Sequence, residues 1–178
     1  MRITPITPGT RAELAALEAQ IGAARGRVSP LYQVLLNSPA MAHGWEQLLS
    51  AVRNHNSLPA GLRELVILRV AVLNGAKYEF DAHVPHALAA GVSQAQIDAV
   101  GASPGGDADD NAPAQLFNTQ EQIALKMTDT MTRDIIVPDA LHAEAAAAFT
   151  SQRLVDLTVT IGAYNMVSRF LVALHVGH

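Results

Sequence analysis

An almost entirely apolar stretch at residues 62–73 constrains the fold more than any other part of the sequence. It reads Leu-Arg-Glu-Leu-Val-Ile-Leu-Arg-Val-Ala-Val-Leu, so a helix formed from it is apolar on nearly every side. Such a helix is typical of a position covered by other elements. Aromatic residues make up 4% of the chain, and its many alanines let helices pack closely without favouring sheets. We therefore expect an all-α protein in which this stretch is buried.

Proline and capping signals mark where other helices begin. Ser29-Pro30 and Ser38-Pro39 each place an N-cap serine before a proline in the first helical position. Capping boxes are expected from Ser93 to Gln96 and from Thr119 to Gln122, where a hydroxyl residue precedes a glutamine by three positions. Together these signals predict a helical bundle of about seven or eight helices.

The stretch 101–114 separates the sequence into two apolar halves. It is rich in glycine, aspartate and proline, and its apolar content is too low for burial, so we expect an exposed, mobile loop. A chain of 178 residues that is 49% hydrophobic supplies enough apolar material for one substantial core. We therefore expect a single domain over residues 1–178.

The composition excludes several classes of function. The chain has no cysteine, which rules out disulfides, thiolate metal sites, iron–sulfur clusters and thiol redox chemistry. Its formal charge is −4 and its basic residues form no cluster, so a nucleic-acid partner is not expected. Pro5 interrupts the start of the chain, and no stretch reaches about 18 uninterrupted apolar residues. We therefore expect a cytoplasmic protein with no membrane partner.

Three ionisable residues in and after the apolar stretch could carry chemistry. Glu64 lies in the helix expected to be buried, where a carboxylate is costly unless it is paired or protonated. Glu79 and His83 are four residues apart, so they share one helical face with Cβ atoms roughly 5–6 Å apart. On one straight helix Glu64 would lie roughly 22 Å from Glu79. The Asn74-Gly75 break can fold the second segment back, so the three residues can converge as a proton-transfer set.

The same region resembles a known family. The pattern Arg-Glu-Leu-x-Ile-Leu-Arg-Val-Ala, then Tyr-Glu-Phe-x-x-His, then an alanine-rich helix ending in Ala-Gly-Val-Ser, is similar to the carboxymuconolactone decarboxylase and alkylhydroperoxidase D-like superfamily. The resemblance covers residues 60–100 and implies a bundle of the alkylhydroperoxidase D-like type. In the peroxidase branch a Cys-x-x-Cys pair precedes the histidine. Ala76 and Glu79 stand at those cysteine positions, while His83 and Glu64 match the histidine and the upstream glutamate. The resemblance therefore implies a cysteine-free branch that is not a thiol peroxidase.

The decarboxylase branch of this family implies a reaction. Its members convert 4-carboxymuconolactone to an enol-lactone in aromatic catabolism without a metal or an organic cofactor. By this resemblance we expect a cofactor-free carboxy-lyase for a small carboxylated ring compound, with His83 as proton donor and Glu64 or Glu79 as its orienting base. Similar proteins form trimers or hexamers, and the very apolar helices also favour a homo-oligomer. The candidates for holding the anionic substrate are basic residues: Arg69, Lys77 and His86.

Structural interpretations of the same residues stay open. Glu64 can be a carboxylate in the first turn of a helix, stabilised by the helix dipole or by a neighbouring arginine. Glu79 and His83 can be a surface pair worth a few tenths of a kcal/mol. His83 and His86, near Asp81, have a spacing that suits metal ligands, but no third ligand is marked and we expect no metal. The chain can also be a non-catalytic helical oligomer that binds a small molecule or a protein partner.

Overall fold

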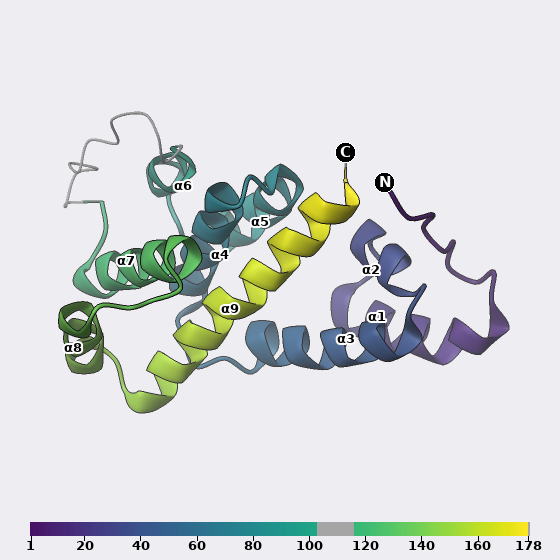
Figure 1. Ribbon diagram of the computed structural model, residues 1–178, viewed down its shortest axis with the longest axis horizontal. Coiled ribbons are helices and arrows are strands. Elements are labelled where there is room, and N and C mark those ends of the chain that lie inside the picture. The colour runs from purple at the N-terminus through teal and green to yellow at the C-terminus, as the bar shows by residue number, and fades with distance from the viewer. Residues whose placement is uncertain (103–115, 178) are drawn as a thin grey trace. The chain divides into compact units, whose positions relative to one another are not determined.

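The computed structural model describes residues 1–102 and 116–177, and the regular structure in these residues is entirely helical (Figure 1). It comprises one 3-10 helix and nine α-helices: η1 (Ala12–Leu14), α1 (Ala15–Arg25), α2 (Pro30–Leu35), α3 (Pro39–Asn54), α4 (Ala60–Leu73), α5 (Lys77–Ala89), α6 (Gln94–Gly101), α7 (Thr119–Arg133), α8 (Asp139–Ala148) and α9 (Ser151–Leu174). The all-α prediction is confirmed. The described helices slightly outnumber the seven or eight expected, because short segments such as α2 form helices of their own.

The chain forms two compact units. One comprises Met1–His55 together with Phe170–His178, and the other comprises Asn56–Arg169. The single domain expected over residues 1–178 stays a prediction. Most of the expected loop, residues 103–114, lies outside the part of the chain that the structure describes. Gly101 does not belong to a loop, because it is the last residue of α6.

The first unit has an apolar core. Trp45 and Phe170 pack against this core, with their ring centroids 5.2 Å apart. The backbone N–H of Arg2 donates to the carbonyl of Leu174 at 2.8 Å. The C-terminal segment is therefore tied into this unit by both side chains and backbone. The buried members of the core are Ile6, Leu14, Ile21, Tyr32, Leu35, Leu36 and Ala42.

A buried glutamate, Glu46 of α3, lies at the centre of a polar network in the first unit. It is 1% exposed, and it accepts hydrogen bonds from Nε of Arg25 at 3.0 Å and from Oγ of Ser50 at 2.5 Å. The hydroxyl of Tyr32 donates a third bond. Burial and the bond to Glu46 raise the pKa of Tyr32 above its usual range, so the phenol keeps its proton. Both oxygens of Glu46 are thus bonded to donors.

Helix α4 is the buried helix of the second unit, as the sequence predicts. Leu65, Val66, Ile67, Leu68 and Val70 are all fully buried. α4 packs against α5, α6 and α7, which explains how a helix that is apolar all round is covered. Figure 1 shows these neighbours around it.

A tight turn folds α5 back against α4. Gly75 takes a φ of +65°, a left-handed conformation that glycine adopts without strain. The N–H of Ala76 donates to the carbonyl of Ala71 at 2.8 Å, and that of Gly75 donates to Val72 at 3.1 Å. These two bonds form a Schellman-type helix end. The break expected at Asn74-Gly75 is therefore present, and it brings residues of α4 and α5 together.

The predicted capping boxes are confirmed in one case and shifted in the other. Ser93 and Gln96 form the reciprocal capping bonds of α6. The box of α7 is made by Asn118 and Glu121, one residue earlier than expected from Thr119. Asparagine is as good an N-cap as threonine, and glutamate suits the reciprocal position as well as glutamine does. The sequence therefore offered two overlapping boxes, and the earlier one forms.

Helix α9 contributes a long, buried face to the second unit. Leu157, Thr160, Ile161, Tyr164 and Ser168 are nearly or fully inaccessible to solvent. By length and composition α9 could cross a membrane, but half of its most apolar window is buried inside the protein. A helix at the centre of a protein core meets the same criterion, so this property alone does not indicate a membrane span.

Candidate functional site

The structure brings Glu64 of α4 and His83 of α5 into direct contact. Nδ1 of His83 lies 2.7 Å from Oε2 of Glu64, and the two residues are 7% and 3% exposed. Glu64 lies beyond the first turn of α4, so the interpretation as a first-turn carboxylate is not supported. A carboxylate can only accept hydrogen bonds, so an ionised Glu64 fixes the ring hydrogen on Nδ1. The Nε2 atom of His83 is then the ring nitrogen that does not bond Glu64, and it is the candidate for proton transfer.

Glu79 is buried separately and is held from α9. It is 2% exposed, and Oγ of Ser168 donates a hydrogen bond to its Oε2. Its other oxygen, Oε1, is buried and has no hydrogen-bond partner among the described residues. The alternative interpretation of Glu79 and His83 as a surface pair is therefore not supported, since both side chains are buried. The structure shows His83 bonded to Glu64 and Glu79 bonded to Ser168.

Burial changes the ionisation of Glu79. Desolvation raises the pKa of Glu79 from its ordinary value of 4.5 to about 8, and the Ser168 bond opposes the rise only in part. Glu79 also lies in the first turn of α5, where the helix dipole favours the ionised form by about 0.3–1 kcal/mol. One pKa unit corresponds to about 1.4 kcal/mol, so the dipole is too weak to offset the effect of burial. Glu79 is therefore uncharged at neutral pH.

Helices α5 and α9 meet in an antiparallel register at this site. The ring of Tyr164 packs edge-on against that of His83, with centroids 5.2 Å apart. Ser168 follows Tyr164 by one turn of α9, and Glu79 precedes His83 by one turn of α5. Ser168 bonds Glu79. Two residues of α5, Glu79 and His83, thus face two residues of α9, Ser168 and Tyr164, and each pair has i, i+4 spacing. Tyr164 and Ser168 had no predicted role in the site, although a serine within a long apolar helix was a visible signal.

Arg63 is the neighbouring arginine that the structural interpretation of Glu64 included. Its Nε lies 3.8 Å from Oε1 of Glu64, on the opposite carboxylate oxygen from His83. This Nε is buried and has no hydrogen-bond partner among the described residues, while the side chain is 16% exposed. A positive charge therefore lies next to the Glu64–His83 pair.

The three basic residues predicted to hold substrate lie in different surroundings. Arg69 makes a bidentate ion pair with Asp129, with both N···O distances at 2.6 Å. Lys77 is exposed and pairs with Asp81 at 2.7 Å. His86 is exposed too, and its ring centroid lies 5.6 Å from that of His83. Arg69 is thus engaged in a structural pair, and the substrate-binding roles of all three stay predictions. In the described ranges no group of three His, Cys, Asp or Glu side chains could hold a metal ion.

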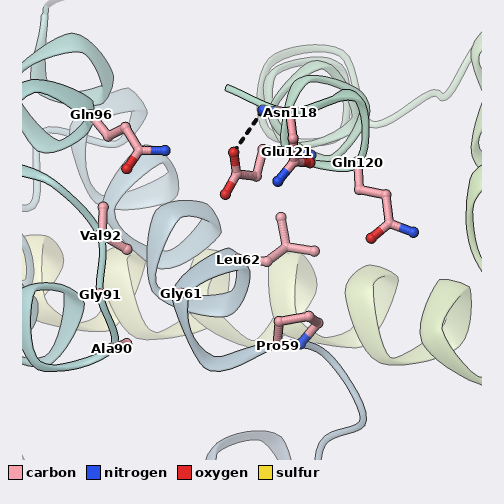
Figure 2. Close-up of a pocket in the computed structure, with 10 residues that line it drawn as sticks. All are labelled: Pro59, Gly61, Leu62, Ala90, Gly91, Val92, Gln96, Asn118, Gln120 and Glu121. Carbon is pink, nitrogen blue, oxygen red and sulfur yellow. Dashed lines mark hydrogen bonds between the residues drawn. The ribbon is translucent and has the colours of Figure 1, made fainter. Parts of the chain in front are cut away.

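A small pocket lies elsewhere in the second unit (Figure 2). Its volume is about 200 Å³, below the roughly 300–1,000 Å³ of most ligand sites. Its polar side chains are already engaged, since Gln96 bonds the carbonyl of Leu116 and Gln120 bonds that of Ala148. None of Glu64, Glu79 and His83 lines it, so we do not place chemistry there. Its lining residues are Pro59, Gly61, Leu62, Ala90, Gly91, Val92, Gln96, Asn118, Gln120 and Glu121.

Comparison with known proteins supports the family resemblance. The profile of the carboxymuconolactone decarboxylase family matches residues 39–114. A solved protein of unknown function from Agrobacterium tumefaciens, named as a candidate antioxidant defence protein AhpD, is 25% identical with a TM-score of 0.70. The match covers 80% of this chain and 92% of that one. Residues 39–114 thus match the carboxymuconolactone decarboxylase family, and the fold is similar to that of an AhpD-like protein. The resemblance seen over residues 60–100 is thereby confirmed.

Two further solved structures share the AhpD-like fold. A variant of the debrominase Bmp8, in complex with 2,3,4-tribromopyrrole, has a TM-score of 0.78 at 14% identity and covers 99% of this chain and 90% of its own. An uncharacterized peroxidase-related protein from a Silicibacter species has the same TM-score and identity, with coverage of 97% and 87%. At this identity the likeness shows the fold alone. No curated protein sequence matches the chain.

Proposed function

We propose that this AhpD-like protein is a cofactor-free lyase of the carboxymuconolactone decarboxylase type, acting by proton transfer on a small carboxylated ring compound. The buried contact of 2.7 Å between Nδ1 of His83 and Oε2 of Glu64 carries the proposal. A histidine oriented by a buried carboxylate is a common arrangement for a catalytic acid or base. The alternative, a non-catalytic scaffold, would be favoured by separated side chains that face solvent.

The proposed reaction gives each residue of the pair one task. Loss of carbon dioxide breaks the bond between the ring carbon and the carboxylate, and the electron pair stays on the substrate. His83 delivers a proton from Nε2 to that carbon and regains one from solvent. Glu64 holds the ring through Nδ1 and stabilises the positive charge that the donor form carries. Substrate carboxylate and one proton thus give product and carbon dioxide.

Arg63 is the cation that we propose for attracting the anionic substrate. It lies beside Glu64, and its Nε has no hydrogen-bond partner among the described residues. Arg69, by contrast, donates from Nε and Nη2 of its guanidinium group to the two carboxylate oxygens of Asp129. A planar guanidinium suits a carboxylate because it can donate two parallel hydrogen bonds.

The proposal also covers the oligomeric state and the cellular location of the protein. We infer a homo-oligomer, a trimer or hexamer, in the cytoplasm, with neither nucleic acid nor membrane as partner. Support for self-association comes from exposed apolar residues of the second unit, which include Ile135 at 86%, Ile136 at 69% and Val155 at 60% exposure. Sedimentation at micromolar concentration tests this point, and a stable monomer would contradict it.

A substrate screen with matched variants tests the lyase function. The purified protein is assayed for carbon dioxide release from carboxylated lactones and related ring-cleavage products. The informative variant is His83→Asn, because its amide N–H can still donate to Glu64 but cannot transfer a proton. We expect turnover to fall on the order of 10²–10⁴-fold. Glu13→Gln, at an exposed position of η1, is the control. Wild-type turnover by His83→Asn would refute the assignment, and no turnover of any compound would favour the scaffold.

A further inference from the structure

Glu79 differs from the other two buried glutamates in one respect. Glu46 has bonds on both carboxylate oxygens, and Glu64 lies between His83 and Arg63. Glu79 receives a single bond, from Ser168 to Oε2, and its buried Oε1 has no partner among the described residues. Buried polar atoms in folded proteins are nearly always hydrogen-bonded, so an orphaned oxygen beside a candidate active site calls for a functional reason.

We propose that Glu79 is an uncharged carboxylic acid whose Oε1–H donates a hydrogen bond to a carbonyl oxygen of the substrate, with Ser168 as its positioning residue. This inference rests on the proposed lyase function and assigns the substrate class more narrowly. The substrate is a carboxylated ring compound in which a carbonyl group is conjugated to the carbon that loses carbon dioxide.

The single bond from Ser168 determines which oxygen carries the proton. With Ser168 as the donor of its bond to Oε2, a carboxylic proton on that same oxygen would compete with the hydroxyl hydrogen. The proton therefore lies on Oε1, and that atom becomes a donor without an acceptor. A bound carbonyl oxygen would supply the missing acceptor.

The surroundings of Glu79 favour the uncharged form. On its own helix, Lys77 is paired with Asp81 and His83 is bonded to Glu64. From α4 the ionisable residue of the site is Glu64, which is bonded to His83. From α9 the contact is the neutral hydroxyl of Ser168, while the neighbouring Arg169 bonds the side chain of Asn165 at 2.5 Å. Among the described residues no cation bonds Glu79, and its raised pKa of about 8 agrees with this environment.

A neutral acid at this place assists the loss of carbon dioxide. When the bond to the departing carboxylate breaks, the electron pair delocalises onto the conjugated carbonyl oxygen as an enolate. A hydrogen bond from Oε1–H is stronger to that developing anion than to the neutral carbonyl, so it lowers the barrier. Glu79 keeps its proton throughout, and His83 protonates the carbon. An ionised Glu79 would instead repel both the enolate and the substrate carboxylate.

The protonation state of Glu79 can be measured without any substrate. Carbon-13 NMR of protein labelled at the glutamate carboxyl carbon follows the titration, with the signal assigned by its absence in Glu79→Gln. We expect a midpoint near 8 rather than near 4.5. In Ser168→Ala the midpoint should move to higher pH, because the Ser168 bond favours the ionised form. A Glu79 midpoint near 4.5 would overturn the inference whatever the enzyme does.

The donor role is tested by turnover on a substrate found in the screen. Glu79→Gln keeps a donor, since its amide oxygen can accept from Ser168 while its NH₂ group takes the place of Oε1–H. We expect it to retain turnover within about tenfold, and Glu79→Leu to lose on the order of 10²–10³-fold. Wild-type turnover should fall as pH rises through about 8, whereas the Gln variant should lack this fall. In Ser168→Ala the fall should shift to higher pH.

The outcomes separate the inference from the function on which it rests. Equal turnover by Glu79→Leu and wild type would overturn the donor role even if His83→Asn is inactive. A Gln variant as inactive as the Leu variant would also overturn it, because proton transfer rather than hydrogen bonding would then be required. If no compound is turned over, the lyase proposal fails, and the NMR midpoint still decides the state of Glu79.

Discussion

Two buried clusters of this protein each centre on glutamate, and they differ in how completely the carboxylates are bonded. In the first unit Glu46 receives bonds from Arg25, Tyr32 and Ser50. In the second unit Glu79 receives one bond and has an orphaned oxygen. A fully bonded buried carboxylate has no capacity left for a ligand, whereas a partly bonded one does. Hydrogen-bond completeness, more than burial, therefore distinguishes a structural glutamate from a candidate functional one.

The largest expected effect on stability comes from Glu46. Glu46→Gln removes the carboxylate charge that pairs with Arg25, whose side chain is 9% exposed. Breaking a buried ion pair in this way costs about 3–5 kcal/mol. Urea unfolding measures the loss, and turnover by the folded variant should match wild type. The double variant Arg25→Met with Glu46→Leu should recover most of the stability. A Glu46→Gln variant that is stable but inactive would contradict the assignment of Glu46 as structural and Glu79 as functional.

Glu79 should show an effect that depends on pH, small near pH 5 and comparable to that of Glu46 near pH 8. The folded protein holds a proton on Glu79 up to about pH 8, while the unfolded chain releases it near 4.5. Its contribution to stability is therefore fully present below about pH 4.5 and is lost as pH rises toward 8. Glu79→Gln has no proton to release, so wild type should lose about 1.4 kcal/mol per pH unit relative to it across this window.

The measurement is urea unfolding of both proteins at several pH values between about 5 and 8. The difference between the two curves removes the contributions of other titrating groups. Glu13→Gln, at an exposed position of η1, is the matched control and should run parallel to wild type. Parallel curves for Glu79→Gln and wild type would show that Glu79 is an ordinary carboxylate.

Arg69 tests whether hydrogen-bond completeness, and not location in the second unit, marks a structural residue. It lies in the second unit, but its guanidinium group is bonded to Asp129. Arg69→Met leaves Asp129 without its bidentate partner, and we expect a loss of about 1–3 kcal/mol in unfolding free energy. Steady-state kinetics should show unchanged turnover and KM. A large rise in KM with normal stability would return Arg69 to the substrate site.

Lys77 should give the smallest effect. Its pair with Asp81 is an exposed i, i+4 pair, in which the lysine side chain is 79% exposed. Such pairs contribute about 0.3–0.5 kcal/mol. Lys77→Ala should therefore unfold close to wild type in a thermal melt and keep its KM. A marked rise in KM would support the original assignment of Lys77 to substrate binding.

The sequence predicted local features of the fold well. The buried helix α4 followed from its apolar run, and its end at Gly75 followed from the Asn74-Gly75 pair. The capping box of α7 begins at Asn118 and not at Thr119, because both residues are good N-caps with a suitable residue three positions later. These features depend on neighbouring residues, which is why a single sequence can reveal them.

Partners distant in sequence could not be predicted in the same way. The bond between Ser168 and Glu79 joins positions 89 apart, and that between Arg69 and Asp129 joins positions 60 apart. Periodicity placed Glu79 and His83 on one face of α5 but did not show what that face meets. The family resemblance singled out Glu64, Glu79 and His83, and their contacts came from the structure.

The antiparallel register of α5 and α9 has a consequence for the order of folding. The bond from Ser168 to Glu79 closes a long loop, and loops of this length form late compared with local helices and turns. During synthesis α4, the turn at Gly75 and α5 can assemble well before Tyr164 and Ser168 leave the ribosome. Glu79 is then still in contact with water and behaves as an ordinary acid. Docking of α9 therefore creates the uncharged acid only after α4 and α5 have assembled.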